Sequence, residues 1–397
     1  MNREDFPILS DDVVFLDNGA TTLKPKVVID KMNEYYLSYS SNIHRGEYDF
    51  SIRADQEYDS VRDKVSQFVH CDRDNVIFTS GATMSLNMVV FGYMKKHLKK
   101  GDVVLLNKAE HASNILPWIK LREEIGIELQ YIPLEDDYSL SLESIQKCIS
   151  SSVKVISLSH VTNVIGDIRD VSSIGKLCHD HHILFVVDGS QSVPHMKEDF
   201  ISSYMDFLCF SAHKMCGPTG VGVLIGKREL LEEMDPIFYG GGMNVFFEED
   251  NTYELKNVPT KFEAGTPPIA EVIGLGKAID YLLSIGMDQI QKQEKDLKNY
   301  FLSKIKEIPN FILYNPNSES GIIIFNLDGV FAQDVAIYLN HYHICVRAGN
   351  HCTKMLKDEM DIKNTVRASF YFYNNYHDID IFVEALKKSK DIFKVVL

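Results

Sequence analysis

Short apolar runs alternate with amphipathic segments between residues 75 and 225, and this alternation is the strongest constraint on the fold. Near-continuous runs such as ILFVVD (183–188) are typical of strands buried on both faces. The segments between them, such as 83–98 and 171–181, read as amphipathic helices. The pattern predicts an α/β fold whose mostly parallel seven-stranded sheet is flanked by helices. The expected strands are 76–79, 103–106, 128–132, 154–159, 183–187, 207–210 and 221–224.

The pattern changes after Pro267 and Pro268, where helices and strands no longer alternate regularly. This change predicts a second, smaller α+β domain, which a chain of 397 residues is long enough to contain. We expect a large domain at 14–282 and a small domain formed by 1–13 and 283–397. A helix at 271–284 is expected to lead into the small domain. The expected elements of that domain are a helix at 287–308, a strand at 321–327, a helix at 332–341, a strand at 344–349 and a helix from about 378.

Five of the predicted strands lead into polar side chains. Open parallel sheets bind ligands at the carboxyl ends of their strands, so these side chains are expected to meet at one edge. They are Ser80 and Thr83, Glu110 and His111, Asn163, Asp188 and Gln191, and Ser211, His213 and Lys214.

Three of these features have both a plain and a functional interpretation. The turn before Thr83 is either an ordinary helix cap or a cradle of backbone N–H groups for an anion. Asp188 either caps the next turn or pairs with a cationic ring nitrogen. Lys214 is either a surface lysine or a partly desolvated amine that attacks a carbonyl carbon. An anion cradle, a ring-nitrogen partner and a reactive amine together point to pyridoxal 5'-phosphate.

Several other classes of protein are disfavoured. GPTGVG (217–222) precedes a strand and lacks the glycine spacing of a dinucleotide fingerprint. A formal net charge of −15 disfavours binding to nucleic acid or to anionic membranes. No signal peptide or membrane span is expected from the sequence. Seven cysteines without a Cys-x-x-Cys pair favour reduced thiols and a cytoplasmic location.

The motifs around these residues resemble those of the cysteine desulfurases, specifically the group II (SufS-type) branch of the class V aminotransferase-fold enzymes. The likeness extends over nearly the whole chain in the expected order. Its carriers are LDNGATTLKP (16–25), NIHRG (42–46), EHASNILPW (110–118), SHVTNVIG (159–166), the segment from DGSQSVPH (188–195) to GPTGVGVL (217–224), YGGGM (239–243), FEAGTP (262–267), VRAGNHC (346–352) and VRASFYFYN (366–374).

The resemblance implies a role for each matching residue. Lys214 would be joined covalently to the cofactor, Asp188 would pair with its ring nitrogen, and His111 would stack on its ring. Arg367 would hold the substrate carboxylate and Cys352 would accept the sulfur atom. The remaining cofactor-binding residues would be Ala82, Thr83, Asn163, Gln191, Ser211, His213 and, from the partner subunit of a homodimer, Thr266. Further substrate-binding residues would be Ala20, Asn163, Arg347 and, from across the dimer, His44.

One position departs from many relatives, which carry Glu-His-His-Ala-Asn where this chain has Glu110-His111-Ala112-Ser113-Asn114. The stacking histidine is retained and its neighbour is not. This departure affects the fine tuning of the site and leaves the chemistry intact.

The sequence itself offers a reason to single out Cys352 among the cysteines. Cys209 and Cys345 lie in apolar strand contexts, where cysteine is usually an inert small hydrophobe. Cys352 lies in a polar loop with Arg347 five positions before it, and nearby cations favour the nucleophilic thiolate. The histidines of CHDHHI (178–183) lie near the expected end of a helix, where they complement its dipole. HYHIC (341–345) has too few convergent ligands for a closed zinc site, so no metal is predicted.

The implied activity is conversion of L-cysteine to L-alanine with a persulfide on Cys352, supplying sulfur for iron–sulfur cluster assembly. A small sulfur-acceptor protein of the SufE or SufU type would be a partner. Selenocysteine lyase activity, another class V lyase or transaminase reaction, and a non-catalytic scaffold remain as alternatives. A keto acid in place of alanine would indicate a transaminase, comparison of the turnover of L-cysteine and L-selenocysteine would identify a selenocysteine lyase, and a scaffold would release no alanine.

Overall fold

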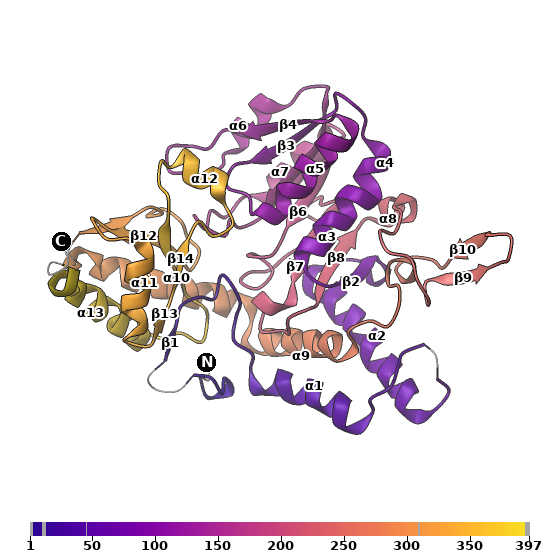
Figure 1. Cartoon of the computed structure of the whole chain (residues 1–397), viewed down its shortest axis with the longest axis horizontal. Helices are drawn as coiled ribbons and strands as arrows, with labels where there is room; N and C mark the ends of the chain where they lie inside the picture. The colour runs from indigo at the N-terminus through magenta and orange to yellow at the C-terminus, as the bar shows by residue number, and fades with distance from the viewer. Residues whose placement is uncertain (1–2, 10–12, 45, 309, 394–397) are drawn as a thin grey trace.

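A computed structural model describes residues 3–9, 13–44, 46–308 and 310–393, and it has two parts joined side by side (Figure 1). The larger part is built on a seven-stranded sheet of order β2-β8-β7-β6-β5-β3-β4. Its strands are β2 (Val76–Thr79), β3 (Val103–Asn107), β4 (Glu128–Ile132), β5 (Val153–Ser159), β6 (Leu184–Asp188), β7 (Phe207–Ser211) and β8 (Gly222–Gly226).

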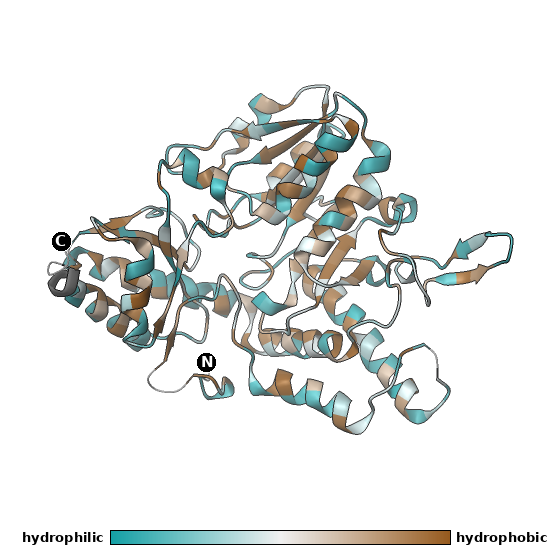
Figure 2. Cartoon of the chain, viewed as in Figure 1, coloured by the Kyte–Doolittle hydropathy of each residue, from teal (hydrophilic) through white to brown (hydrophobic). Residues whose placement is uncertain are grey.

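Helices cover both faces of this sheet. The alternation of side chains along each strand sends one set of apolar residues to each face, and each set packs against its own group of helices. One face carries α2 (Asp49–Val69), α6 (Leu142–Cys148), α7 (Val171–Asp180) and α9 (Ile269–Ile285). The other carries α3 (Ala82–Met88), η3 (Val89–Met94), α5 (Leu116–Ile125) and α8 (Arg228–Glu233). The strands are accordingly hydrophobic along most of their length (Figure 2).

The smaller part has its own apolar core around an antiparallel sheet of order β11-β12-β15-β14. The strands are β11 (Phe311–Leu313), β12 (Ile322–Leu327), β14 (Arg347–Gly349) and β15 (Thr365–Ser369). The accompanying helices are α10 (Met287–Lys304), α11 (Ala332–Asn340), α12 (Lys354–Glu359) and α13 (Tyr376–Phe393). The N-terminal strand β1 (Val14–Phe15) pairs in parallel with β13 (Ile344–Cys345), so the start of the chain lies beside this part.

Two further elements extend from the larger part. Helix α1 (Lys26–Ser38) packs beside α9, and a hairpin of β9 (Asn244–Phe247) and β10 (Tyr253–Leu255) projects away from the body of the molecule (Figure 1). Among the described residues, none of the helices is both long and apolar enough to cross a bilayer.

The predicted fold class is confirmed, with differences in detail. The sheet is mostly parallel, but β8 runs antiparallel to both of its neighbours, β2 and β7. The expected helix at 83–98 contains the π-helical turn η3. The expected strand at 344–349 divides into β13 and β14, which belong to different sheets. The boundaries proposed for the two domains stay a prediction.

Candidate active site

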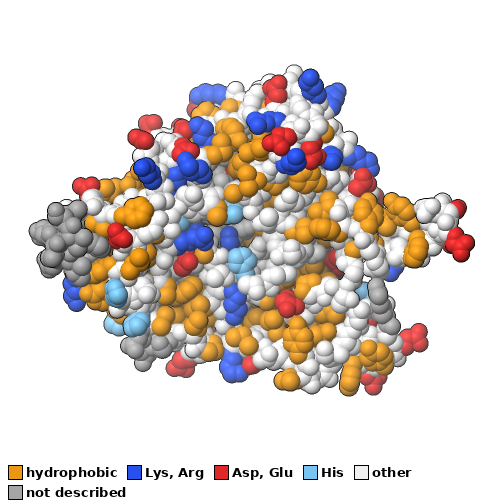
Figure 3. Space-filling view, viewed as in Figure 1, with side chains coloured by type: hydrophobic (Ala, Val, Ile, Leu, Met, Phe, Trp, Pro, Cys, Tyr) orange, Lys and Arg blue, Asp and Glu red, His pale blue; other side chains and the backbone are white. Residues whose placement is uncertain are grey.

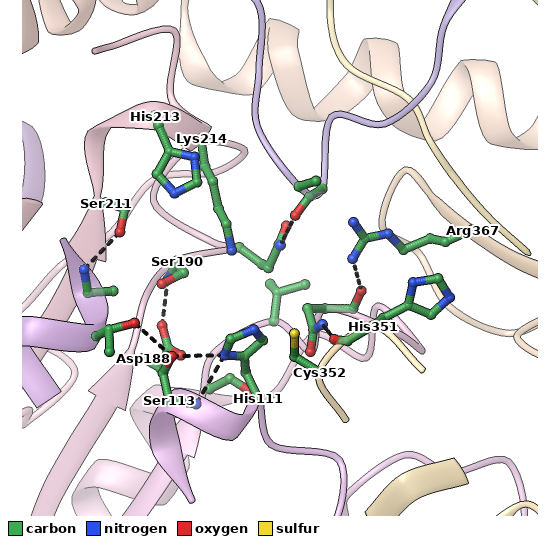
Figure 4. A pocket seen from close by; sticks show the side chains of 18 of the residues that line it. His111, Ser113, Asp188, Ser190, Ser211, His213, Lys214, His351, Cys352 and Arg367 are labelled. Carbon is green, nitrogen blue, oxygen red and sulfur yellow. Dashed lines mark hydrogen bonds between the residues drawn. The ribbon is translucent and has the colours of Figure 1, made fainter. Parts of the chain in front are cut away.

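A cavity of about 190 Å³ lies at the carboxyl edge of the large sheet, where the two parts of the molecule meet. On the face seen in Figure 3, Lys, Arg and His side chains gather at the centre, between the two parts. Figure 4 shows side chains from both parts converging on this cavity. The lining includes Lys214, Asp188 and His111 from the large part and Cys352 and Arg367 from the small part.

Lys214 follows β7 and lies at the end of the short turn η5 (Ala212–Lys214). Burial lowers the pKa of its amine to about 8, while the Asp188 carboxylate opposes that shift. Asp188 ends the buried strand β6, and the backbone N–H of Ser190 donates to its Oδ1 at 2.9 Å. The site therefore holds, beside a carboxylate, an amine that loses its proton far more readily than an ordinary lysine.

The turn between β2 and α3 offers a cradle at one end of the cavity. Gly81 has a φ of 149°, which favours glycine, and the N–H of Ala82 donates to Ser211 Oγ at 2.8 Å. A Cβ at Gly222 would lie 2.4 Å from the Cα of Gly81, so a glycine in β8 lets this strand approach the turn. The neighbouring His213 has its pKa lowered to about 4, mainly by burial.

His111 is held in a fixed orientation at the cavity wall. Its Nδ1 accepts a hydrogen bond from the backbone N–H of Ser113 at 3.1 Å, which leaves Nε2 to carry the proton of the neutral ring. Burial, followed by the charge of Lys214, lowers the pKa of the imidazole. The neutral form of the ring is thus favoured at the wall of the cavity.

A fully buried ion pair lies beneath His111. Arg169 donates to the carboxylate of Glu110 and to the carbonyl oxygen of Ser159, the latter at 3.0 Å. Glu110 also accepts from Asn114 Nδ2 and from the N–H of Ser159, both at 2.8 Å. These bonds join the ends of β3 and β5 to the loop that carries His111.

The Cys352 loop is docked onto the same region of the large part. The N–H of Ala112 donates to the carbonyl oxygen of Cys352 at 2.9 Å, and Asn163 Nδ2 donates to the carbonyl oxygen of His351 at 2.8 Å. His351 and Cys352 have φ values of 55° and 60°, a region that non-glycine residues rarely adopt. The strained backbone turns the Cys352 side chain into the open part of the cavity.

Cys352 differs from the other six cysteines, all of which the structure describes. It is exposed, whereas the others are buried or half-buried. Burial raises the thiol pKa of each of the six, in the case of Cys71, Cys178 and Cys216 to about 12. Because the thiolate is the nucleophile, Cys352 is the cysteine placed to react.

Arg367 is nearly fully buried in β15, yet part of its guanidinium lacks a partner. Its Nη1 donates to the carbonyl oxygen of Asn163 at 2.9 Å, and its Nη2 reaches Asp17 Oδ1 at 3.3 Å. Its Nε has no hydrogen-bond partner. A buried donor without an acceptor is costly, so the site is suited to an anionic group that enters from the cavity.

The structure brings together all but two of the residues predicted for the site. The cavity is lined by Ala20, Ala82, Thr83, His111, Asn163, Asp188, Gln191, Ser211, His213, Lys214, Arg347, Cys352 and Arg367. His44 and Thr266 do not line it; His44 is bonded to Asp55, and Thr266 to Asn42. The amide of Asn163, expected to contact substrate, is bonded to the cysteine loop, and Gln191 Nε2 donates to the carbonyl oxygen of Gly19 at 2.7 Å.

Six further lining residues were not singled out from the sequence. They are Gly19, Ser113, Ser159, Val161, Ser190 and His351. All six lie within motifs that carry the resemblance, and all but Ser159 lie next to a residue that was chosen or one position removed from it. Several contribute backbone atoms, which a motif of side-chain types does not signal.

Comparison with known proteins gives a consistent result. Residues 14–382 match the aminotransferase class-V family. The chain is 42% identical over 395 residues to a probable cysteine desulfurase of Halalkalibacterium halodurans, covering 98% of this chain and 97% of that protein. It is 38% identical over 414 residues to a cysteine desulfurase of Haloferax volcanii, with 98% and 96% covered.

Solved structures agree. The apo cysteine desulfurase from Thermococcus onnurineus NA1 superposes with a TM-score of 0.94 at 36% identity, covering 97% of this chain and 96% of that one. The cysteine desulfurase CsdA from Escherichia coli, in its S-sulfonic acid form, gives a TM-score of 0.93 at 32% identity, with 98% of both chains covered.

Proposed function

The chain belongs to the aminotransferase class-V family and is a pyridoxal-phosphate-dependent cysteine desulfurase, and we propose that it converts L-cysteine to L-alanine by passing the sulfur to Cys352. The observation that carries this proposal is the convergence of Lys214, Asp188 and the exposed Cys352 on one cavity. The resemblance of the motifs supports the group II (SufS-type) branch.

The residues present fit the cofactor. The turn at Gly81 suits a phosphate, and the amine of Lys214, whose pKa burial lowers to about 8, suits an aldehyde carbon. Ser211, His213, Ala82 and Thr83 would hold the phosphate, Asp188 the ring nitrogen, Gln191 the ring hydroxyl and His111 the ring face. When bound, pyridoxal phosphate supplies an electron sink for the bond that breaks at the substrate α-carbon.

Lys214 would act as the base. Burial lowers the pKa of its Nζ to about 8, so the uncharged amine is available to accept the proton from the substrate α-carbon. Asp188 would hold the ring nitrogen of the cofactor, where a carboxylate would favour the protonated form of that nitrogen. His111, with Nδ1 occupied by Ser113, presents Nε2–H to the cavity and assists in returning a proton to the product.

Arg367 would bind the substrate carboxylate. It offers the unpaired Nε and an Nη2 that is only weakly engaged with Asp17 at 3.3 Å. A planar guanidinium binds a carboxylate through two parallel hydrogen bonds, which fixes the direction of the substrate as well as its position. Arg347, Asn163 and Ala20 would line the rest of the substrate site.

Cys352 would take the sulfur. Its thiolate attacks the substrate Sγ, a new S–S bond forms, and the bond between that sulfur and the substrate β-carbon breaks. The carbon fragment takes up the bonding electrons and a proton and leaves as L-alanine. One L-cysteine and one Cys352 thiol therefore become one L-alanine and one Cys352 persulfide.

We also propose a cytoplasmic homodimer that delivers sulfur to a SufE- or SufU-type carrier for iron–sulfur cluster assembly. His44 and Thr266 lie on a shared surface outside the cavity of their own chain, where Asn42 Nδ2 donates to Thr266 Oγ1 at 3.2 Å. This placement supports their reaching a partner's cavity. The exposure of Cys352 supports transfer to an external acceptor.

The experiment measures the attachment of the cofactor and the release of alanine separately. Purified enzyme is reduced with borohydride and digested, and the cofactor label is expected on the peptide that contains Lys214. Cys352→Ala is expected to keep the cofactor and to lose at least about 99% of alanine release, whereas the matched variant Cys148→Ala should stay active. A label on any other peptide, or full activity without Cys352, would refute the proposal.

Two alternatives are tested in the same assay. A transaminase would yield a keto acid in place of alanine. A selenocysteine lyase would turn over L-selenocysteine far faster than L-cysteine and would leave no persulfide on Cys352.

A further inference from the structure

Lys24 is a half-buried cation that lies outside the cavity lining and has no part in the proposed reaction. Its ammonium donates to Thr21 Oγ1 at 3.1 Å, to the carbonyl oxygen of His213 at 3.1 Å and to the carbonyl oxygen of Thr22. An ammonium has three N–H donors, so all three are used. No ion pair joins Lys24 to a carboxylate among the residues that the structure describes, and burial lowers its pKa to about 8.

The carbonyl oxygen of His213 is the common acceptor in this cluster. Besides Lys24, it receives the backbone N–H of Thr22 at 3.0 Å and the hydroxyls of Thr21 at 3.0 Å and Thr22 at 3.2 Å. This carbonyl belongs to the peptide group whose nitrogen is that of Lys214. The N-terminal segment therefore holds, through hydrogen bonds, the peptide group that links His213 to the reactive Lys214.

The same segment also holds the chain beyond Lys214. Thr22 Oγ1 accepts from the N–H of Cys216 at 2.8 Å, and Cys216 has a φ of 63°. Between these two anchor points lie only Lys214 and Met215. The backbone around Lys214 is thus fixed from outside its own strand and turn.

We propose that Lys24 is a positioning residue that fixes the peptide between His213 and Lys214, and with it the direction in which Lys214 enters the cavity. A carbonyl that accepts a charged donor is held more strongly than one bound to neutral groups alone. The charge has a second consequence, because Lys24 is one of the cations that disfavour protonation of His213. The inference rests on the proposed function, in which Lys214 carries the cofactor and His213 contacts its phosphate.

The test compares cofactor binding in variants of the full-length enzyme. Lys24→Met removes the donors and the charge while keeping most of the length of the side chain, and Lys24→Arg keeps both the donors and the charge. Lys26→Met, at an exposed lysine two positions further along, is the matched control. Each protein is assayed for its pyridoxal phosphate dissociation constant and for the circular dichroism of the visible cofactor band, which reports the orientation of the cofactor on Lys214.

We expect Lys24→Met to raise the dissociation constant about tenfold, the loss corresponding to one hydrogen bond to a charged group, and to change the visible dichroism. Lys24→Arg should have a dissociation constant and a visible dichroism close to those of the wild type, and Lys26→Met should match the wild type. Wild-type values for both quantities in Lys24→Met would overturn the inference. If that variant does not fold, Thr21→Val, which removes one hydroxyl from the same carbonyl, should shift the dichroism in the same direction, and a wild-type spectrum would overturn it equally.

The outcome separates the two proposals. If the wild-type enzyme does not carry the cofactor on Lys214, the proposed function fails. If it does, and the Lys24 variants bind and orient the cofactor normally, only the role of Lys24 fails.

Discussion

At the scale of single residues, burial distinguishes one exposed thiol from six whose pKa it raises. Cys352 is exposed, whereas burial raises the pKa of Cys71 and Cys178 to about 12. We expect iodoacetamide at neutral pH to alkylate Cys352 first, because the thiolate is the reacting form. Peptide mass spectrometry after timed quenching checks the order. Equal labelling of Cys352 and Cys178 in the native protein would contradict the prediction, and all seven should react once urea is added.

A second prediction at this scale concerns the protonation of Lys214. Its pKa is lowered to about 8, so reductive methylation with formaldehyde should rise through about pH 8 in the cofactor-free protein and level off above it. Asp188 opposes the shift and Arg347 adds to it. Asp188→Asn should therefore move the midpoint to lower pH, and Arg347→Met should move it to higher pH.

The measurement is the methylated fraction of the Lys214 peptide at each pH. Lys176 in the same digest is the internal reference, because its hydrogen bond to Asp180 raises its pKa. Parallel pH curves for Lys214 and Lys176 would show that burial does not lower the pKa of Lys214. A shift of the opposite sign in either variant would show that the charges of Asp188 and Arg347 do not act on the amine as expected.

At the scale of elements, the ends of β3 and β5 are joined by the buried pair of Arg169 and Glu110. Arg169→Met would leave the Glu110 carboxylate buried without a counter-charge, which lowers the free energy of unfolding by about 3–5 kcal/mol. Adding Glu110→Gln to that variant should restore a large part of the loss. The exposed pair of Lys176 and Asp180 provides the control, and Lys176→Met should barely change stability.

Urea unfolding followed by tryptophan fluorescence measures this loss locally. Trp118 is the single tryptophan of the chain, and its Nε1 lies 3.5 Å from Asn114 Oδ1, a member of the same network. A stability equal to that of the wild type in Arg169→Met, or a double variant weaker than the single one, would contradict the prediction.

The strands of the large sheet could be predicted because most are apolar over much of their length, whereas β4 (ELQYI) alternates polar and apolar side chains over its first four residues. The expected strands at 76–79 and 128–132 match β2 and β4 residue for residue, and the other five differ by one or two residues at an end. The direction of β8 could not be predicted, since a local pattern does not encode which strands become neighbours. The division of 344–349 into β13 and β14 has the same origin, because the two halves find partners in different sheets.

Site residues follow a similar rule. Lys214, Asp188 and His111 could be identified because an unusual polar side chain follows an apolar strand. Cys352 and Arg367 lie on elements of the smaller part, and the resemblance of their motifs, not a strand-end pattern, marked Arg367. Lys24 could not be identified from the sequence, because its partners are two backbone carbonyls and a hydroxyl that come together only in the folded chain.

At the scale of the whole molecule, the segment before α1 connects the two parts. Asn18 Nδ2 donates to the carbonyl oxygen of Ser369 at 2.6 Å, and Gly19 N–H donates to Ser369 Oγ at 2.8 Å, both in the small part. A few residues later, Thr22 N–H donates to His213 in the large part. The two ends of the cavity, Arg367 and Lys214, are thereby held by one short stretch of chain.

The projecting hairpin carries the last prediction, because its apolar side chains lack cover within the chain. Phe247 is 78% exposed, and Val245 and Tyr253 are each 59% exposed. Contiguous exposed apolar side chains mark an interaction surface. In a homodimer the hairpin would be covered, and the surface that contains His44 and Thr266 would face the partner's cavity.

Phe247→Asp combined with Tyr253→Asp should therefore convert the proposed dimer to a monomer. If Thr266 contacts the phosphate in the partner's site, as proposed, cofactor retention should also weaken at least about tenfold, the loss of one hydrogen bond to a phosphate. Light scattering over a range of concentrations measures the mass, and gel filtration measures the retained cofactor. Ile337→Asp is the control, since Ile337 on α11 is 61% exposed but lies on the small part. A double variant that stays dimeric would place the interface elsewhere. A monomer that retains its cofactor fully would show that each cavity is complete within its own chain.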